Sequence, residues 1–183
     1  MPGQAVTAEH NIPPIWNPSS RILILGSFPS QISRTHAFYY ANPKNRFWRV
    51  MAAVLGCEMP ENTKEKRKML LHAGIALWDV VRSCSISGSS DASIREYQPN
   101  DLSFLTEQAQ IRRIFTNGSA AYRLYRNSAK SVTDIAAVRL PSTSSANAAC
   151  SLETLIEIWS GEIRPYLEDI PAVIHHEAIL TDL

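Results

Sequence analysis

Cysteine is scarce in this chain of 183 residues, which contains only Cys57, Cys84 and Cys150. An odd number of widely spaced cysteines argues against a disulfide framework and fits a reducing compartment. Three cysteines are also too few for a four-cysteine zinc site or an iron–sulfur cluster built from this chain alone. No other group of side chains has metal-ligand spacing, so we expect neither a metal nor another cofactor.

Long apolar runs and a surplus of charge of one sign are also absent. No stretch has the roughly 20 apolar residues that span a bilayer. The N-terminus lacks the basic flank and apolar core of a signal peptide, so we expect a cytoplasmic protein that does not contact membranes. The formal net charge of +1 does not by itself indicate a nucleic-acid partner. One local basic group is present: Arg34, Lys44, Arg46 and Arg49.

Three catalytic motifs are missing. No Gly-x-Ser-x-Gly elbow surrounds Ser27, which makes this serine a poor esterase nucleophile. The chain has no Gly-x-x-x-x-Gly-Lys phosphate loop and no His-x-Glu with paired cysteines, the signature of zinc deaminases. The polar groups that remain are amides, hydroxyls and aromatic rings. Such groups recognise a base by hydrogen bonds and stacking, and they can orient a water molecule.

Four apolar runs alternate with helical patterns and define the expected fold. Runs without polar alternation are typical of strands buried on both faces. Strands that alternate with helices form a parallel sheet covered by helices on both sides. We therefore predict a three-layer α/β/α sandwich with a central four-stranded parallel sheet. The strands are expected at residues 21–25, 75–81, 111–116 and 135–140.

The length suits one domain with a single core, which we place at residues 21–183 and expect to be a monomer. Residues 1–20 contain four prolines and are predicted to form an irregular arm held by Ile15 and Trp16. Residues 82–99 are rich in serine and glycine, and we predict a long loop there that carries Asp91.

A helix is expected to begin at Asn42 and Pro43, which suit the N-cap and the first helical position. The apolar residues that follow have helical spacing up to Gly56: Phe47, Val50, Met51, Val54 and Leu55. Asn45 would then lie in the first turn, near the positive end of the helix dipole. We expect it to face the crevice that follows Gly26.

In parallel sheets, ligands bind beyond the carboxyl ends of the strands. Each expected end leads into a segment rich in glycine or small polar residues: 26–30, 82–91, 117–119 and 141–147. Four such segments at one edge predict one site. Asp79 interrupts an apolar strand and needs polar partners or water, either as a functional acid or as a structural carboxylate.

Five short motifs occur in order at these strand ends: Gly26-Ser27-Phe28-Pro29-Ser30, Tyr39-Tyr40 to Asn45-x-Phe47-Trp48, Ala76-Leu77-Trp78-Asp79-Val80, Asn117-Gly118 and Leu140-Pro141-Ser142-Thr143-Ser144-Ser145-Ala146. Together they resemble the uracil-DNA glycosylase superfamily, and within it the deoxyinosine (hypoxanthine)-DNA glycosylase branch. The resemblance covers residues 21–159. It implies an α/β/α glycosylase-like domain that flips a deaminated base out of DNA and hydrolyses its glycosidic bond. We expect hypoxanthine as the base, with uracil and xanthine as further candidates.

The resemblance also implies site residues. Asn45 is the expected catalytic residue and would position the water. The residues expected to hold the base are Gly26, Ser27, Phe28, Tyr40 and Asn117. The residues expected to contact DNA are Ser30, Arg34, Lys44, Pro141, Ser142, Thr143, Ser144 and Asn147. Asp79 and Asp91 are additional candidates.

Two departures from the better-known uracil branch bear on the choice of base. Phe28 stands where that branch has Asp or Asn, and Leu140 stands where it has a histidine. The usual water-orienting group and the usual imidazole donor are therefore both missing. Asn45 would have to take over the water, and efficient excision of uracil is not expected.

Each of these residues also has a purely structural interpretation. Asn45 could be a helix-turn residue, and Phe28 and Tyr40 could be core aromatics. Asn117 could be a turn residue, because Asn-Gly is a turn dipeptide, and the serines of 141–147 could be ordinary loop hydroxyls. Two other functions also remain open: a hydrolase of small nucleosides or nucleotides, and a DNA-lesion binder without catalysis.

Overall fold

The computed structural model describes residues 6–86, 94–128 and 133–167. Its centre is a four-stranded sheet in the order β3-β2-β6-β7. The strands are β2 (Ile22–Gly26), β3 (Ile75–Asp79), β6 (Arg113–Asn117) and β7 (Ala137–Leu140). All three neighbouring pairs are parallel, as predicted.

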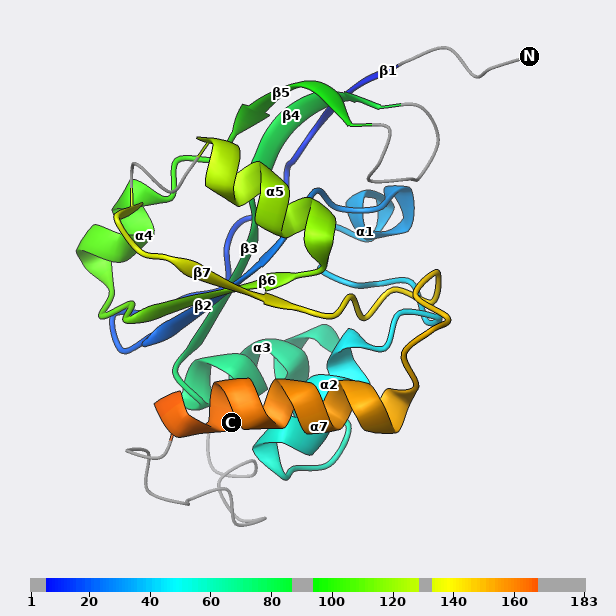
Figure 1. The fold of residues 1–183 in the computed structure, drawn as a ribbon, viewed down its shortest axis with the longest axis vertical. Helices are drawn as coiled ribbons and strands as arrows, with labels where there is room; N and C mark the ends of the chain where they lie inside the picture. The colour runs from blue at the N-terminus through cyan, green and yellow to red at the C-terminus, as the bar shows by residue number, and fades with distance from the viewer. Residues whose placement is uncertain (1–5, 87–93, 129–132, 168–183) are drawn as a thin grey trace.

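Helices cover both faces of this sheet (Figure 1). Successive residues of β2 point to opposite sides, as in any strand, so Ile22 and Ile24 enter one core cluster while Leu23 and Leu25 enter the other. The first cluster contains residues of α2 (Phe47–Leu55), α3 (Thr63–His72) and α7 (Leu152–Ile163). The second contains residues of α4 (Ser103–Gln108) and α5 (Ser119–Ser128). The predicted three-layer α/β/α sandwich is confirmed.

A second sheet was not predicted. β1 (Val6–Glu9), β4 (Val81–Ile86) and β5 (Arg95–Pro99) form an antiparallel sheet in the order β1-β4-β5. The irregular arm predicted at 1–20 and the long loop predicted at 82–99 are both wrong in this respect. β4 buries only some of its residues, and the polar ones between them make the segment resemble a loop in sequence. Asp91 lies outside the described residues.

The helix predicted from Asn42 begins later, at Phe47. Residues 42–45 form a turn, in which the Asn45 N–H donates to the Asn42 carbonyl at 2.9 Å. The Arg46 N–H then donates to the carbonyl of Thr143 at 3.0 Å. This long-range bond takes the place of a helical one and delays the helix. The helix ends as predicted at Gly56, whose φ of 66° is the left-handed cap conformation.

The remaining elements are short. α1 (Gln31–Thr35) follows the loop after β2, and a 3-10 turn, η2 (Arg164–Tyr166), follows α7. Among the described residues, no helix has the length and apolar character needed to span a membrane.

Candidate active site

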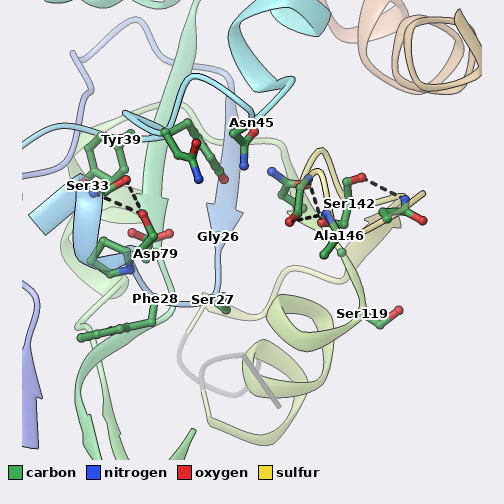
Figure 2. Close-up of a pocket in the computed structure, with 18 of the residues that line it drawn as sticks. Gly26, Ser27, Phe28, Ser33, Tyr39, Asn45, Asp79, Ser119, Ser142 and Ala146 are labelled. Carbon is green, nitrogen blue, oxygen red and sulfur yellow. Dashed lines mark hydrogen bonds between the residues drawn. The ribbon is translucent and has the colours of Figure 1, made fainter. Parts of the chain in front are cut away.

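The carboxyl ends of the four parallel strands border one cleft of about 1000 Å³. It is lined from the segment after β2, the turn before α2, Asp79, and the segments that follow β6 and β7 (Figure 2). Gly26 and Ser142 therefore lie at the same edge, as the sequence predicted. The volume lies at the upper end of the roughly 300–1,000 Å³ usual for ligand pockets, so a whole nucleotide can enter.

Asn45 and Asn117 are joined at the edge of this cleft by Thr143. The Thr143 hydroxyl donates to Asn45 Oδ1 at 2.9 Å and accepts from Asn117 Nδ2 at 2.9 Å. The Thr143 N–H donates to Asn117 Oδ1 at 2.9 Å. Asn45 Oδ1 also accepts the N–H of Phe47 at 2.9 Å. With Oδ1 fixed by two donors, Nδ2 is the part of the Asn45 amide that can serve the cleft.

This network bears on the expected roles of Thr143 and Asn117. Thr143 was expected to contact DNA, but its side chain is fully buried and joins the two asparagines instead. Asn117 lines the cleft, but it already directs both its amide oxygen and its amide nitrogen to Thr143. One Nδ2 hydrogen and one Oδ1 lone pair remain beyond these bonds, and the two bonds to Thr143 fix the direction in which they point.

Arg46 holds the segment that follows β7. Its guanidinium donates to the backbone carbonyls of Thr143 at 3.3 Å, Ser144 at 2.8 Å and Asn147 at 3.0 Å, and also to the carbonyl of Cys150. The sequence had grouped Arg46 with a surface basic patch. In the structure its guanidinium instead binds four backbone carbonyls within residues 143–150.

The same segment is shaped by internal hydrogen bonds and by close packing against Gly118. Asn147 Nδ2 donates to the Ser142 carbonyl at 3.0 Å, and the Ser142 hydroxyl accepts the N–H of Ser144 at 3.2 Å. Gly118 has a φ of 94°, and a Cβ there would approach the Ser142 Cβ to 3.0 Å. Four of the predicted DNA-contact residues line the cleft here: Pro141, Ser142, Ser144 and Asn147.

The floor of the cleft contains Gly26 and two aromatic residues. Tyr40 stacks on Phe47 with ring centroids 4.0 Å apart, so this buried phenylalanine fixes the orientation of the tyrosine ring. Phe28 is largely buried, and the Arg34 guanidinium lies 5.2 Å from its ring centroid. A Cβ on Gly26 would clash with Asp79 Oδ1 and come within 3.1 Å of the Tyr40 hydroxyl. Only glycine allows these groups to meet.

The other predicted residues occupy different positions around the cleft. Ser27 and Ser30 line it, and the Ser30 hydroxyl accepts the N–H of Ser33 at 3.2 Å as the N-cap of α1. Arg34 lines it too and donates to the Pro29 carbonyl at 2.8 Å. Lys44 is exposed in the turn before α2 and does not line the cleft.

Sequence reasoning missed His10. Its Nε2 lies 2.8 Å from Asp79 Oδ2, and both side chains are almost completely buried. Tyr39 holds the adjoining segment by donating to the carbonyls of Ile12 and Pro13 at 3.1 and 3.0 Å. Burial raises the pKa of Tyr39 above its ordinary value, and the nearby Asp79 charge raises it further. The only signal in the sequence was the need of Asp79 for a partner.

Residues 13–160 match the family model of the uracil DNA glycosylase superfamily. The chain belongs to this superfamily. Its curated relatives include proteins named hypoxanthine DNA glycosylase from two species. One, from Methanosarcina acetivorans, is 38% identical over 62% of this chain and 73% of its own length. The other, from Methanosarcina barkeri, is 30% identical over 60% of this chain and 71% of its own length.

The fold agrees with membership of the uracil DNA glycosylase superfamily. The solution NMR structure of a Methanosarcina acetivorans protein assigned to the uracil DNA glycosylases superposes with a TM-score of 0.75 and 33% sequence identity. The alignment covers 88% of this chain and 99% of that one. The superfamily resemblance seen in the five sequence motifs is therefore confirmed.

Thr143→Val should slow base release about tenfold or more, although the side chain never reaches the cleft. Valine keeps the volume and removes the hydroxyl that orients Asn45 and Asn117, so the amides lose their fixed position. The measurement is the single-turnover rate on a lesion duplex. Thr143→Ser, which restores the hydroxyl, should recover most of the rate, and an unaffected Thr143→Val enzyme would show that the network is unimportant.

Proposed function

We propose that this protein is a monofunctional DNA glycosylase that removes hypoxanthine from DNA. Superfamily membership makes it a DNA glycosylase for deaminated bases, and the choice of hypoxanthine is our proposal. The observation that carries it is the Asn45–Thr143–Asn117 network at the edge of a nucleotide-sized cleft. Two relatives that bear the hypoxanthine name support the choice of base.

The proposed reaction is hydrolysis of the glycosidic bond after the nucleotide leaves the base stack, because its C1′ atom is unreachable inside the duplex. Water oxygen bonds to C1′ as the bond to the base breaks. The electron pair of that bond leaves with the base, which takes up a proton, and the oxygen bound to C1′ releases one of the two water protons to solvent. Asn45 contributes a hydrogen bond from its Nδ2 to the water oxygen. This bond holds the nucleophile beside C1′, which becomes electron-deficient as the base leaves.

The lining of the cleft favours a purine leaving group. Leu140 is buried and apolar, so it cannot donate a hydrogen bond to a departing pyrimidine. The absence of one such donor typically costs about 3 kcal/mol of barrier. A purine can be protonated on its second ring and depends less on that donor. Phe28 and Tyr40 supply aromatic surface for the larger base.

The DNA strand is proposed to follow the rim formed by Arg34, Ser142, Ser144 and Asn147, which line the cleft. Hydroxyl, amide and guanidinium groups suit phosphate oxygens and fix register without recognising sequence. Lys44 is exposed in the turn between Asn42 and Asn45, which both line the cleft. We also propose that a monomer is sufficient, because one chain supplies the whole described cleft, and that the enzyme acts on DNA in the cytoplasm.

Deoxyinosine should be processed at least about tenfold faster than deoxyuridine in the same sequence context, for the leaving-group reason given above. The test uses matched duplexes with one hypoxanthine, uracil or xanthine, single-turnover conditions, and alkali to cut abasic sites. An unmodified duplex is the control. Faster release of uracil would overturn the choice of base and leave the superfamily intact.

A further inference from the structure

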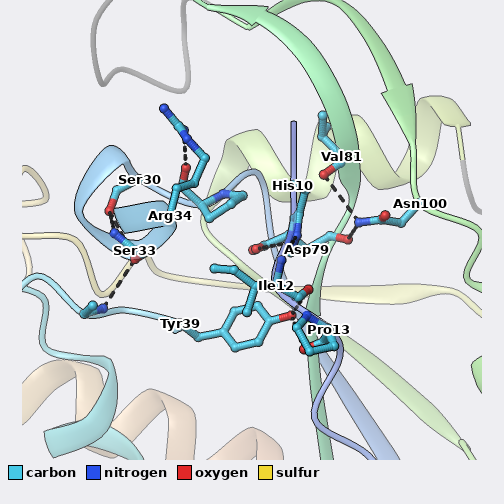
Figure 3. A network of polar contacts seen from close by, with 12 residues as sticks. His10, Ile12, Pro13, Ser30, Ser33, Arg34, Tyr39, Asp79, Val81 and Asn100 are labelled. Carbon is cyan, nitrogen blue, oxygen red and sulfur yellow. Dashed lines mark hydrogen bonds and ion pairs between the residues drawn. The ribbon is translucent and has the colours of Figure 1, made fainter. Parts of the chain in front are cut away.

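The buried pair of His10 and Asp79 lies at the cleft and has no part in the Asn45–Thr143–Asn117 network (Figure 3). Asp79 is the last residue of β3, and its Oδ2 is hydrogen-bonded to His10 Nε2 at 2.8 Å. Its Oδ1 lies against Gly26, where a Cβ would clash with it. The carboxylate therefore occupies the same part of the cleft floor as the glycine turn.

The hydrogen bonds of His10 determine which of its two ring nitrogens carries the proton. The Ile12 N–H donates to His10 Nδ1 at 3.2 Å, so Nδ1 is an acceptor. The proton is then on Nε2, which donates to Asp79 Oδ2. A neutral His10 in this tautomer leaves Asp79 as a carboxylate whose second oxygen, Oδ1, can only accept hydrogen bonds.

The surroundings hold the pair rigidly. The His10 ring packs edge-on against Phe28 and Trp78, with centroids 6.2 and 6.5 Å away. The Asp79 backbone carbonyl accepts a hydrogen bond from Asn100 Nδ2 at 2.9 Å, and Asn100 is itself buried. A buried carboxylate with so few degrees of freedom suits recognition of a single donor.

We propose that Asp79 is a specificity-determining residue that accepts the ring N–H of the flipped base, and that His10 is its positioning residue. The proposal rests on the proposed function. Deamination of adenine converts N1 from a lone-pair acceptor into an N–H donor. A fixed carboxylate attracts that N–H and repels the adenine lone pair. Guanine shares the N1–H and must be excluded by other contacts.

The test is binding of non-cleavable duplexes with a 2′-fluoroarabino nucleotide that carries either hypoxanthine or unsubstituted purine. Purine keeps both rings and has a lone pair at N1. The quantity compared is the ratio of the two Kd values, measured by fluorescence anisotropy. Because the same duplexes are used throughout, differences in their own stability cancel between wild type and variant.

Asp79→Asn should reduce the preference for hypoxanthine at least about tenfold, because a charge-assisted hydrogen bond is lost. The amide oxygen of the asparagine would accept the hydrogen bond from His10 Nε2. Its NH₂ group would then face the cleft as a donor, which favours the N1 lone pair of purine. His10→Leu should lower the ratio in the same direction. His10→Gln, which keeps a donor at the Nε2 position, should retain it, and exposed Asp134→Asn should have no effect.

An unchanged ratio in Asp79→Asn, or an equal loss of both affinities, would overturn the proposal. If circular dichroism shows that Asp79→Asn does not fold, the ratio of the two Kd values is compared between His10→Leu and His10→Gln. Equal ratios in these two variants would overturn the proposal. The proposed function fails separately, if wild-type enzyme releases no base from a deoxyinosine duplex.

Discussion

Asn45→Ala should lower the single-turnover rate of hypoxanthine release at least about a hundredfold, the usual scale for loss of one positioned catalytic group. The alanine removes the Nδ2 donor proposed to hold the water. Binding to a non-cleavable lesion duplex should change little, because the rim residues remain. The rate per bound complex and the Kd are measured separately.

The matched control is Asn42→Ala. Asn42 belongs to the same turn and accepts the Lys44 N–H at 3.0 Å, but it has no bond to Thr143 in the described structure. It should retain most of the rate. If Asn45→Ala loses binding while the rate per bound complex holds, Asn45 is only the residue that receives the Phe47 N–H at the start of α2.

Arg46→Met is expected to have the second large effect. Methionine keeps an unbranched apolar stem and removes every guanidinium donor to the carbonyls of residues 143–150, while the backbone N–H of residue 46 still reaches the Thr143 carbonyl. Carbonyls that lose a charged donor in a partly buried site destabilise the fold by about 2 kcal/mol or more. The variant should therefore unfold at lower urea concentration. It should also bind the lesion duplex at least about tenfold more weakly, because the rim of the cleft is no longer held.

Arg46→Lys separates charge from geometry. A lysine keeps the charge but cannot direct several N–H groups to separate carbonyls as the planar guanidinium does. It should recover little of the loss. Arg49→Met, an exposed position in α2, should behave as wild type. Equal weakening by Arg49→Met and Arg46→Met would show that Arg46 acts only through the overall basic charge.

The layers and the location of the site were predictable because apolar content decides them. The runs that became β2 and β3 have buried residues throughout or nearly so, and no alternative element accommodates them as well. Once four parallel strands are accepted, their carboxyl ends must meet. The cleft followed from that rule, and Gly26 and Ser142 both line it.

The parts that could not be predicted depend on contacts between distant residues. The late start of α2 comes from a bond between Arg46 and Thr143, which are 97 positions apart. The partner of Asp79 is His10, 69 positions earlier. β4 mixes buried residues with partly buried serines and an exposed Arg82 in no regular alternation, so its composition resembles a loop until β1 and β5 are placed beside it. No local pattern contains such information.

The central claim is that this cleft releases hypoxanthine from DNA, and direct detection of the free base tests it most directly. A duplex with one deoxyinosine is incubated with wild-type enzyme, and the small molecules are separated and identified by mass spectrometry. We predict free hypoxanthine in amounts equal to the alkali-sensitive sites, and no hydrolysis of free deoxyinosine. Tight binding without released base, or hydrolysis of the free nucleoside with the duplex untouched, would contradict the claim.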